Sequence, residues 1–148
     1  MSNNNVSIEK ALRIALRAHE GQVDKAGRPY ILHPMTVAAR MTTDDGIITA
    51  LLHDVVEDSV FTIDDLDSLF SPNIIEALTL LTHEKGTDYF TYIHKLKDNP
   101  LARAVKIEDL LHNSDLSRLG RDITDKDIQR RNKYQKALAI LCSDNKNE

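Results

Sequence analysis

Apolar residues recur at helical spacing along most of this chain. In the first such stretch they follow the i, i+3, i+4, i+7 pattern of one helix face: Ile8, Ala11, Leu12, Ala15 and Leu16. Ser7, a residue type that caps helix N-termini, directly precedes them. No segment shows sustained alternation of apolar and polar residues or a two-residue hairpin turn. The pattern predicts helices, the first starting after Ser7, and no sheet.

Start signals divide the rest of the chain. Proline at the first helical position, or Ser, Thr, Asp or Asn just before an apolar run, marks a helix N-terminus. Such signals occur at His33-Pro34, Asp44-Asp45, Thr62, Ser71-Pro72, Thr87, Asn99-Pro100 and Thr124. Residues 21–29 are expected to form a loop, and the last helix to end near Cys142. We predict an all-α, single-domain bundle of roughly eight helices over residues 1–148, with an ordered core at 7–142 and frayed ends.

Composition narrows the class of protein. Of the 148 residues, 41% are hydrophobic and 28% charged, as in soluble globular domains. The net charge of −4 argues against a nucleic-acid partner, although a local basic pocket for one phosphate ligand is compatible with it. Cys142, the single cysteine, cannot form an internal disulfide, and its spacing with Leu138 and Leu141 predicts a buried position. Without a signal peptide or membrane-spanning run, we expect a cytoplasmic protein with no membrane partner, either a monomer or a homodimer.

The adjacent pair His53-Asp54 lies inside the apolar run of residues 47–56. A carboxylate among aliphatic side chains loses hydration and needs a cation or hydrogen bonds to compensate it. Next to an imidazole, a bound metal ion supplies that compensation; the alternative is a core histidine hydrogen-bonded to a neighbour. Two further segments, around His33 and Asp109, carry side chains of the right type to complete a metal site. We therefore expect a metal-dependent hydrolase.

The expected ligand set is His33, His53, Asp54 and Asp109. Imidazole nitrogen and carboxylate oxygen suit Mn²⁺, Fe²⁺ or Zn²⁺, and the lack of thiolates argues against structural zinc. Four protein ligands leave coordination positions for water and substrate, as catalysis requires.

The segment around Asp109 carries a second pattern. Lys106, Asp109 and Asn113 share one helix face, since they fall at i, i+3 and i+7. A cation, a carboxylate and an amide on one face suit a metal with phosphate beside it, so Lys106 and Asn113 are candidate substrate-binding residues. The alternative is a simple Lys106–Asp109 surface pair. His112, one turn after Glu108, is expected to pair with it.

Two acidic residues, Glu57 and Asp58, follow one turn after His53-Asp54. A carboxylate near a metal site can orient an attacking water or take its proton, which makes both residues candidate catalytic groups. The alternative is an acidic helix C-terminus without function, which the helix dipole disfavours.

The loop at residues 21–30 places two cations and a tyrosine just ahead of His33. Lys25 and Arg28 are candidates to meet phosphate or to stack on a base, and Tyr30 to pack beneath the site. The alternative is a solvated polar loop.

Four segments together resemble the HD superfamily, and within it the hydrolase domain of the bifunctional alarmone enzymes and the small stand-alone alarmone hydrolases. They are AHEGQ (18–22), GRPYILHP (27–34), ALLHDVVED (50–58) and VKIEDLLHN (105–113). The resemblance implies that His33, His53, Asp54 and Asp109 bind one divalent ion, usually Mn²⁺, and that Glu57 and Asp58 activate water. It implies that Lys25 and Asn113 contact a small guanosine polyphosphate, and that the 3′-diphosphate of guanosine 3′,5′-bis(diphosphate) is removed. With no room for a synthetase domain, a hydrolase-only form is expected.

The chain departs from the family pattern around the expected substrate contacts. Asp24 stands where the family usually has an arginine before the loop lysine, and Leu110 stands where an arginine follows the metal-binding aspartate. Asp115 and Leu116 replace an expected arginine and threonine. Two alternatives therefore stay open: a metal-dependent phosphohydrolase of another nucleotide or phosphoester, and a metal-stabilised nucleotide-binding protein without turnover.

Overall fold

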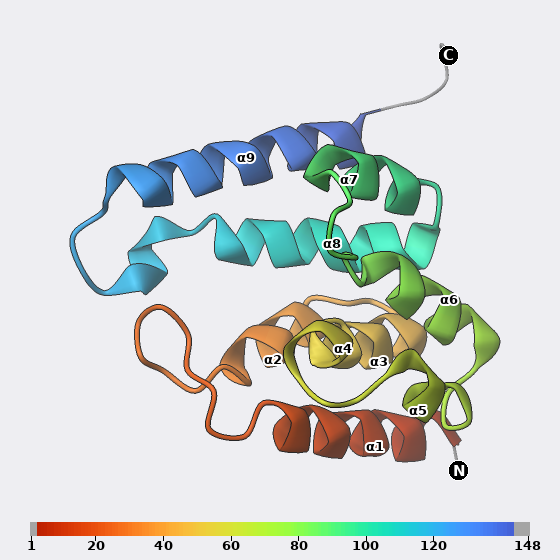
Figure 1. Cartoon of the computed structure of the whole chain (residues 1–148). Helices are drawn as coiled ribbons and strands as arrows, with labels where there is room; N and C mark the ends of the chain where they lie inside the picture. Colours follow the sequence, from red (N-terminus) through yellow and green to blue (C-terminus); the bar gives the residue numbers. More distant parts are fainter. Residues whose placement is uncertain (1–2, 144–148) are drawn as a thin grey trace.

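The computed structural model describes residues 3–143, which form nine α-helices and one 3₁₀ helix with no β-strand among them (Figure 1). The predicted all-α bundle is confirmed. In chain order the elements are α1 (Asn3–Ala18), α2 (Leu32–Ala39), α3 (Asp44–Leu52), α4 (Val55–Asp58), α5 (Ile63–Asp67), α6 (Pro72–Leu81), α7 (Tyr89–Lys97), α8 (Pro100–Asn113), η1 (Leu116–Leu119) and α9 (Asp125–Cys142).

Most predicted helix starts are confirmed because the capping side chains form the expected bonds. Thr62 and Thr124 each cap a helix through a capping box with the residue three positions on. Asn99 accepts the N–H of Ala102, and Pro100 follows it as the first residue of α8.

Three predicted starts are wrong by a few residues. α2 begins at Leu32, so Pro34 is its third residue and not its first. α1 begins at Asn3, so Ser7 lies inside the helix and is not its cap. α7 begins after Asp88, whose carboxylate accepts the N–H of Thr91, one residue later than the expected Thr87 cap. Residues 3–6 of the expected frayed N-terminus are helical, and Met1, Ser2 and residues 144–148 lie outside the described residues.

The ninth helix arises at the His53-Asp54 pair. The sequence predicts one helix running through this pair, but α3 ends at Leu52 and α4 begins at Val55. His53 and Asp54 therefore stand at a junction between two helices. This break turns both side chains away from a regular helical path and toward α8.

The helices pack around one hydrophobic core with α8 near its centre. α8 contacts α2, α3 and α6 on one side and α7 and α9 on the other. Figure 1 shows α7 and α9 above α8 and the layer of α1, α2 and α3 below it. Fully buried aliphatic side chains from both layers fill the space between them: Val37, Ile48, Leu52, Val55, Leu78, Leu96, Val105, Leu110 and Leu141.

Two further predictions from the sequence concern the burial of Cys142 and the absence of a membrane-spanning helix. Cys142 is exposed, so its predicted buried position is wrong; Leu141 takes the core position on that turn of α9. None of the helices described for residues 3–143 combines the length and hydrophobicity needed to cross a bilayer.

Candidate metal centre

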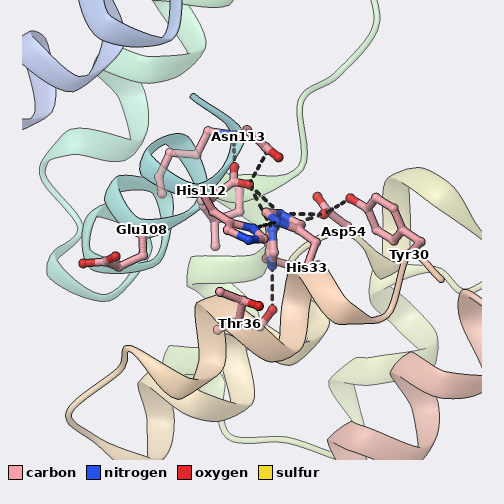
Figure 2. Close-up of polar contacts among 12 residues, drawn as sticks. Tyr30, His33, Thr36, Asp54, Glu108, His112 and Asn113 are labelled. Atoms are coloured by element: carbon pink, nitrogen blue, oxygen red, sulfur yellow. Dashed lines mark hydrogen bonds and ion pairs between the residues drawn. The ribbon is translucent and has the colours of Figure 1, made fainter. Parts of the chain in front are cut away.

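The four residues predicted to bind a metal lie together between α2, the α3–α4 junction and α8. One ligand atom from each of His33, His53, Asp54 and Asp109 lies within 4.8 Å of every other. His33 Nε2 is 2.8 Å from Asp109 Oδ1 and 3.7 Å from Asp54 Oδ2. His53 Nε2 is 3.1 Å from Asp54 Oδ2 and 3.5 Å from Asp109 Oδ1. Figure 2 shows His33 and Asp54 turned toward this common point.

The orientation of His53 leaves one ring nitrogen available. Its Nδ1 lies 2.5 Å from the carbonyl oxygen of Ala50, which makes Nδ1 the donor. Its Nε2 is buried among the acids and forms no hydrogen bond within residues 3–143. A buried nitrogen fixed by a bond on the far side of the ring is the usual arrangement of a metal-binding histidine.

His33 is oriented by His112, for which the sequence predicts a different partner, Glu108. His33 Nδ1 lies 2.8 Å from His112 Nδ1, and the two rings stack, so His112 does not pair with Glu108 (Figure 2). Burial and the nearby Arg118 lower the pKa of His112 to about 4. A neutral His112 accepts the Nδ1 proton of His33, which leaves His33 Nε2 directed at Asp109.

The charges of the cluster favour a cation at its centre. Burial opposes ionisation of Asp54, but the neighbouring His53 lowers the pKa of Asp54 to about 2. Burial opposes ionisation of Asp109 as well, but Lys106, His33 and His53 together hold the pKa of Asp109 well below its ordinary value. Burial also opposes positive charge on His53, yet Asp54 and Asp109 raise the pKa of His53 well above its ordinary value. The donor set, the free His53 nitrogen and these two carboxylates suit a divalent metal.

Three residues predicted to lie at the substrate site, Lys106, Asn113 and Tyr30, contact the acids of the cluster in this structure. Lys106 Nζ lies 2.8 Å from Asp109 Oδ2, and Asn113 Nδ2 donates to Asp109 Oδ1 at 3.0 Å. The Tyr30 hydroxyl donates to Asp54 (Figure 2). These contacts orient the carboxylates and compensate their burial.

Two cavities flank the cluster. The first, of about 260 Å³, lies between the loop at residues 23–26, the end of α8, η1 and α9; we call it the loop-side cavity. Lys25 lines it, whereas the exposed Arg28 lines neither cavity. The second, of about 350 Å³, is lined by Glu57 and Asp58 of α4 and by residues of the α6–α7 connection, α7, α8 and α9; we call it the α4-side cavity. Tyr30, Asn113 and Tyr134 line both cavities, so the two are adjacent.

Glu57 and Asp58 stand in the α4-side cavity beside Asp54 and Asp109. Burial raises the pKa of both Glu57 and Asp58, and the negative Asp54 adds to the effect. Glu57 also accepts the backbone N–H of His83, which fixes its carboxylate relative to the α6–α7 connection. A fixed carboxylate with a raised pKa, next to a metal site, suits proton transfer from water.

Asp24, one of the departures from the family pattern, is engaged by the protein itself. Its Oδ1 accepts the backbone N–H groups of Ala26 and Arg28, both at 2.9 Å, which shapes the loop. Its Oδ2 lies 4.0 Å from Arg118 of η1. Arg118 also donates to the carbonyl of His112 and to Asn113 Oδ1. Arg118 thus places positive charge in the loop-side cavity, where the family pattern has its arginines at other positions.

Several residues that border the site were not predicted from the sequence to lie there. His112, Arg118, His83 and Tyr89 reach the site from α8, η1, the α6–α7 connection and α7. The sequence carried one usable signal, the i, i+3 spacing of Tyr89 and Tyr92 in one predicted helix; both rings also pack with that of His83. Their spacing indicates an aromatic cluster but not that it borders the metal site.

The fold and site define an all-α bundle with a buried cluster of two histidines and two aspartates that suits a divalent metal. The family model described as HD domain matches residues 11–109, which include all four of these residues. The chain belongs to the HD domain family.

Known proteins place the chain near one branch of that family. It is 42% identical over 73 residues to the bifunctional (p)ppGpp synthase/hydrolase SpoT of Escherichia coli, covering 47% of this chain and 10% of that protein. It is 32% identical over 125 residues to the GTP pyrophosphokinase rsh of Brucella melitensis, covering 74% of this chain and 17% of that protein. The chain thus spans a small part of the curated relatives it matches.

A solved structure matches nearly the whole chain. It is described as "A metazoan ortholog of SpoT hydrolyzes ppGpp and plays a role in starvation responses". The match covers 95% of this chain and 88% of that one, with a TM-score of 0.75 and 25% sequence identity. The likeness therefore extends beyond the matched family segment to α9.

Proposed function

We propose that this protein is a metal-dependent hydrolase that removes the 3′-diphosphate from guanosine 3′,5′-bis(diphosphate) and its 5′-triphosphate analogue. The observation that carries the proposal is the cluster of His33, His53, Asp54 and Asp109 between two cavities, one of which holds Glu57 and Asp58. The names of the relatives support the same substrate class. The cytoplasmic location and the monomeric or homodimeric state stay predictions.

His33, His53, Asp54 and Asp109 would hold one divalent ion, with Mn²⁺ the expected metal and Fe²⁺ or Zn²⁺ compatible with the same donors. When bound, such an ion makes water more acidic and draws charge from phosphate oxygens. Tyr30, Lys106 and Asn113 keep the two carboxylates directed at the site by hydrogen bonding.

The protein's own acids handle the proton of the attacking water. Glu57 and Asp58 orient the water, and one of them accepts its proton. The water oxygen bonds to the phosphorus attached to ribose O3′, and the O3′–P bond breaks. O3′ takes up a proton, so that one water is consumed and GDP (or GTP) and pyrophosphate are released. Lys25 and Arg118 supply positive charge in the loop-side cavity for the nucleoside 5′-phosphates.

A second candidate is hydrolysis of another nucleotide at the same centre. Asp24 in the loop-side cavity favours it, since it places an anion where the family usually has an arginine. Its pairing with Arg118 reduces the repulsion of phosphate, so we rank the guanosine polyphosphate first. A binding protein without turnover fits less well, because Glu57 and Asp58 then have no task at the site.

The test is metal analysis of the purified protein coupled to a nucleotide hydrolysis panel. Wild-type protein with Mn²⁺ is expected to release pyrophosphate from guanosine 3′,5′-bis(diphosphate) faster than it cleaves nucleoside monophosphates or triphosphates. Asp54→Ala should fold and lose turnover by at least about a hundredfold, since it lacks one ligand. Glu108→Gln, which removes a surface ion pair with Arg40 at 3.5 Å, is the matched control and should keep its activity. Cleavage of a different nucleotide with the bis(diphosphate) left intact would overturn the substrate assignment.

A further inference from the structure

The α4-side cavity contains polar groups that the proposed hydrolysis does not use. Besides Glu57 and Asp58 it is lined by Lys133, Tyr89 and Tyr134, which come from α7 and α9. The metal-site residues Asp54 and Asp109 line the same cavity. Any phosphate chain that lies against the metal site and extends into this cavity therefore meets these residues.

Lys133 is the cation that remains available in this cavity. Its Nζ lies 4.5 Å from the ring centroid of Tyr89 and 5.7 Å from that of Tyr134. Within residues 3–143 it forms no ion pair with a carboxylate. Lys106, the other lysine of the cavity, is committed to Asp109 at 2.8 Å. Two aromatic rings thus hold the Lys133 ammonium at the cavity without neutralising it.

Tyr89 adds a donor without a partner. Its hydroxyl oxygen is buried and forms no hydrogen bond to any described residue. The neighbouring Tyr92 differs, since its hydroxyl donates to the carbonyl of Leu81 at 2.6 Å. A buried hydroxyl without a partner is destabilising, which indicates that a water or ligand forms a hydrogen bond with it.

We propose that Lys133 and the Tyr89 hydroxyl form an anchor for the terminal phosphate of the diphosphate that is transferred to water, and so select a 3′-diphosphate over a 3′-monophosphate. The inference rests on the proposed function and names a specificity determinant within it. The inner phosphate lies at the metal centre, where the scissile bond is. The outer phosphate reaches the ammonium and the hydroxyl, both of which donate hydrogen bonds and one of which carries a full positive charge. A monophosphate ends before these groups.

The test compares two substrates, guanosine 3′,5′-bis(diphosphate) and guanosine 5′-diphosphate 3′-monophosphate, with Mn²⁺-loaded protein. Lys133→Met keeps the apolar stem over Tyr89 and removes the charge. We expect kcat/KM for the bis(diphosphate) to fall about tenfold, and for the monophosphate to change by less than about twofold. Tyr89→Phe keeps the ring and removes the hydroxyl. It should lower kcat/KM for the bis(diphosphate) by about threefold to tenfold without loss of thermal stability. Lys136→Met, on an exposed turn of the same helix, is the charge-matched control and should leave both substrates unchanged.

A binding measurement separates this inference from the proposed function. Titration of inorganic pyrophosphate into Mn²⁺-loaded wild-type protein should show tighter binding than orthophosphate, and Lys133→Met should remove most of the difference. If wild-type protein hydrolyses neither guanosine nucleotide, the proposed function fails while this titration still tests the anchor. The anchor is wrong if Lys133→Met affects diphosphate and monophosphate equally, or affects neither, in turnover and in titration.

Discussion

At the scale of single residues, Asp109 is the best-compensated acid of the metal site. One of its oxygens is shared by His33 and Asn113, and the other faces Lys106. Among residues 3–143, the Asp54 carboxylate is contacted by Tyr30, His33 and His53, and it is partly exposed to the α4-side cavity. The carboxylate set is therefore asymmetric, with its better solvated member on the side where Glu57 and Asp58 stand. Water access and proton transfer are thus expected on that side.

Glu57→Gln tests this assignment. The amide keeps the size of the side chain and can still accept the N–H of His83, but it cannot take a proton from water. We expect kcat to fall about a hundredfold or more with KM and Mn²⁺ affinity little changed, as for loss of a general base. Steady-state kinetics and metal titration measure this. Glu84→Gln, an exposed neighbour of His83, is the control. A kcat within twofold of wild type would transfer the role to Asp58.

The four members of the His/Asp cluster could be predicted from the sequence, whereas the residues that orient them could not. His53-Asp54 stands out because the charge of an acid in an apolar run must be compensated by a cation or by hydrogen bonds. The segments around His33 and Asp109 offer the same imidazole and carboxylate donors. His112 shows the limit: its spacing to Glu108 suggested a partner on its own helix, but the packing of α2 on α8 brings His33 closer. Spacing along one helix carries no information about a side chain that arrives from another.

At the scale of elements, capping chemistry explains which helix boundaries were predictable. Thr62, Asn99 and Thr124 carry local signals that the fold uses. The break at residues 53–54 has no such signal, because residues 47–56 contain no proline or glycine and are otherwise apolar apart from Thr49 and the His53-Asp54 pair. The position of this break is therefore set by tertiary packing.

The start of α9 gives a prediction about pH. Asp127 is buried and accepts hydrogen bonds from Arg121, Thr124 and Arg130. The bonds from Arg121, followed by the Thr124 N–H, hold the pKa of Asp127 well below its ordinary value. Because the folded-state pKa of Asp127 is lowered, its ionised carboxylate stabilises the fold at pH values above its unfolded pKa of about 4. This stabilisation is lost progressively as the pH falls below about 4.

Asp127→Asn should therefore lower the melting temperature at pH 7, and its deficit against wild type should shrink as the pH falls from 4 toward 2. Thermal unfolding in EDTA at several pH values measures this without interference from metal binding. Asp125→Asn, an exposed acid in the same first turn, is the control and should show a small, nearly constant effect. A deficit for Asp127→Asn that does not vary with pH would show that packing, rather than ionisation, accounts for its contribution.

At the scale of the whole molecule, the metal centre lies between the two layers of the bundle. Three of its residues come from α2 and the α3–α4 junction in one layer, and Asp109 comes from α8, which also packs against α7 and α9 (Figure 1). An ion bound by all four therefore links segments that separate on unfolding. Metal binding and global stability are expected to be coupled.

Saturation with Mn²⁺ should raise the melting temperature of the wild-type protein. At a free metal concentration one hundred times Kd the gain is about 2.7 kcal/mol, or roughly 5–10 °C for a chain of this size. Asp54→Ala, compared with its own melting temperature in EDTA, should lose most of the shift, whereas Glu108→Gln should retain it. Calorimetry across a metal series measures both, and excess EDTA should reverse the gain. An equal shift in Asp54→Ala would place the stabilising ion elsewhere, because removing one ligand of the four-residue cluster weakens binding there and nowhere else.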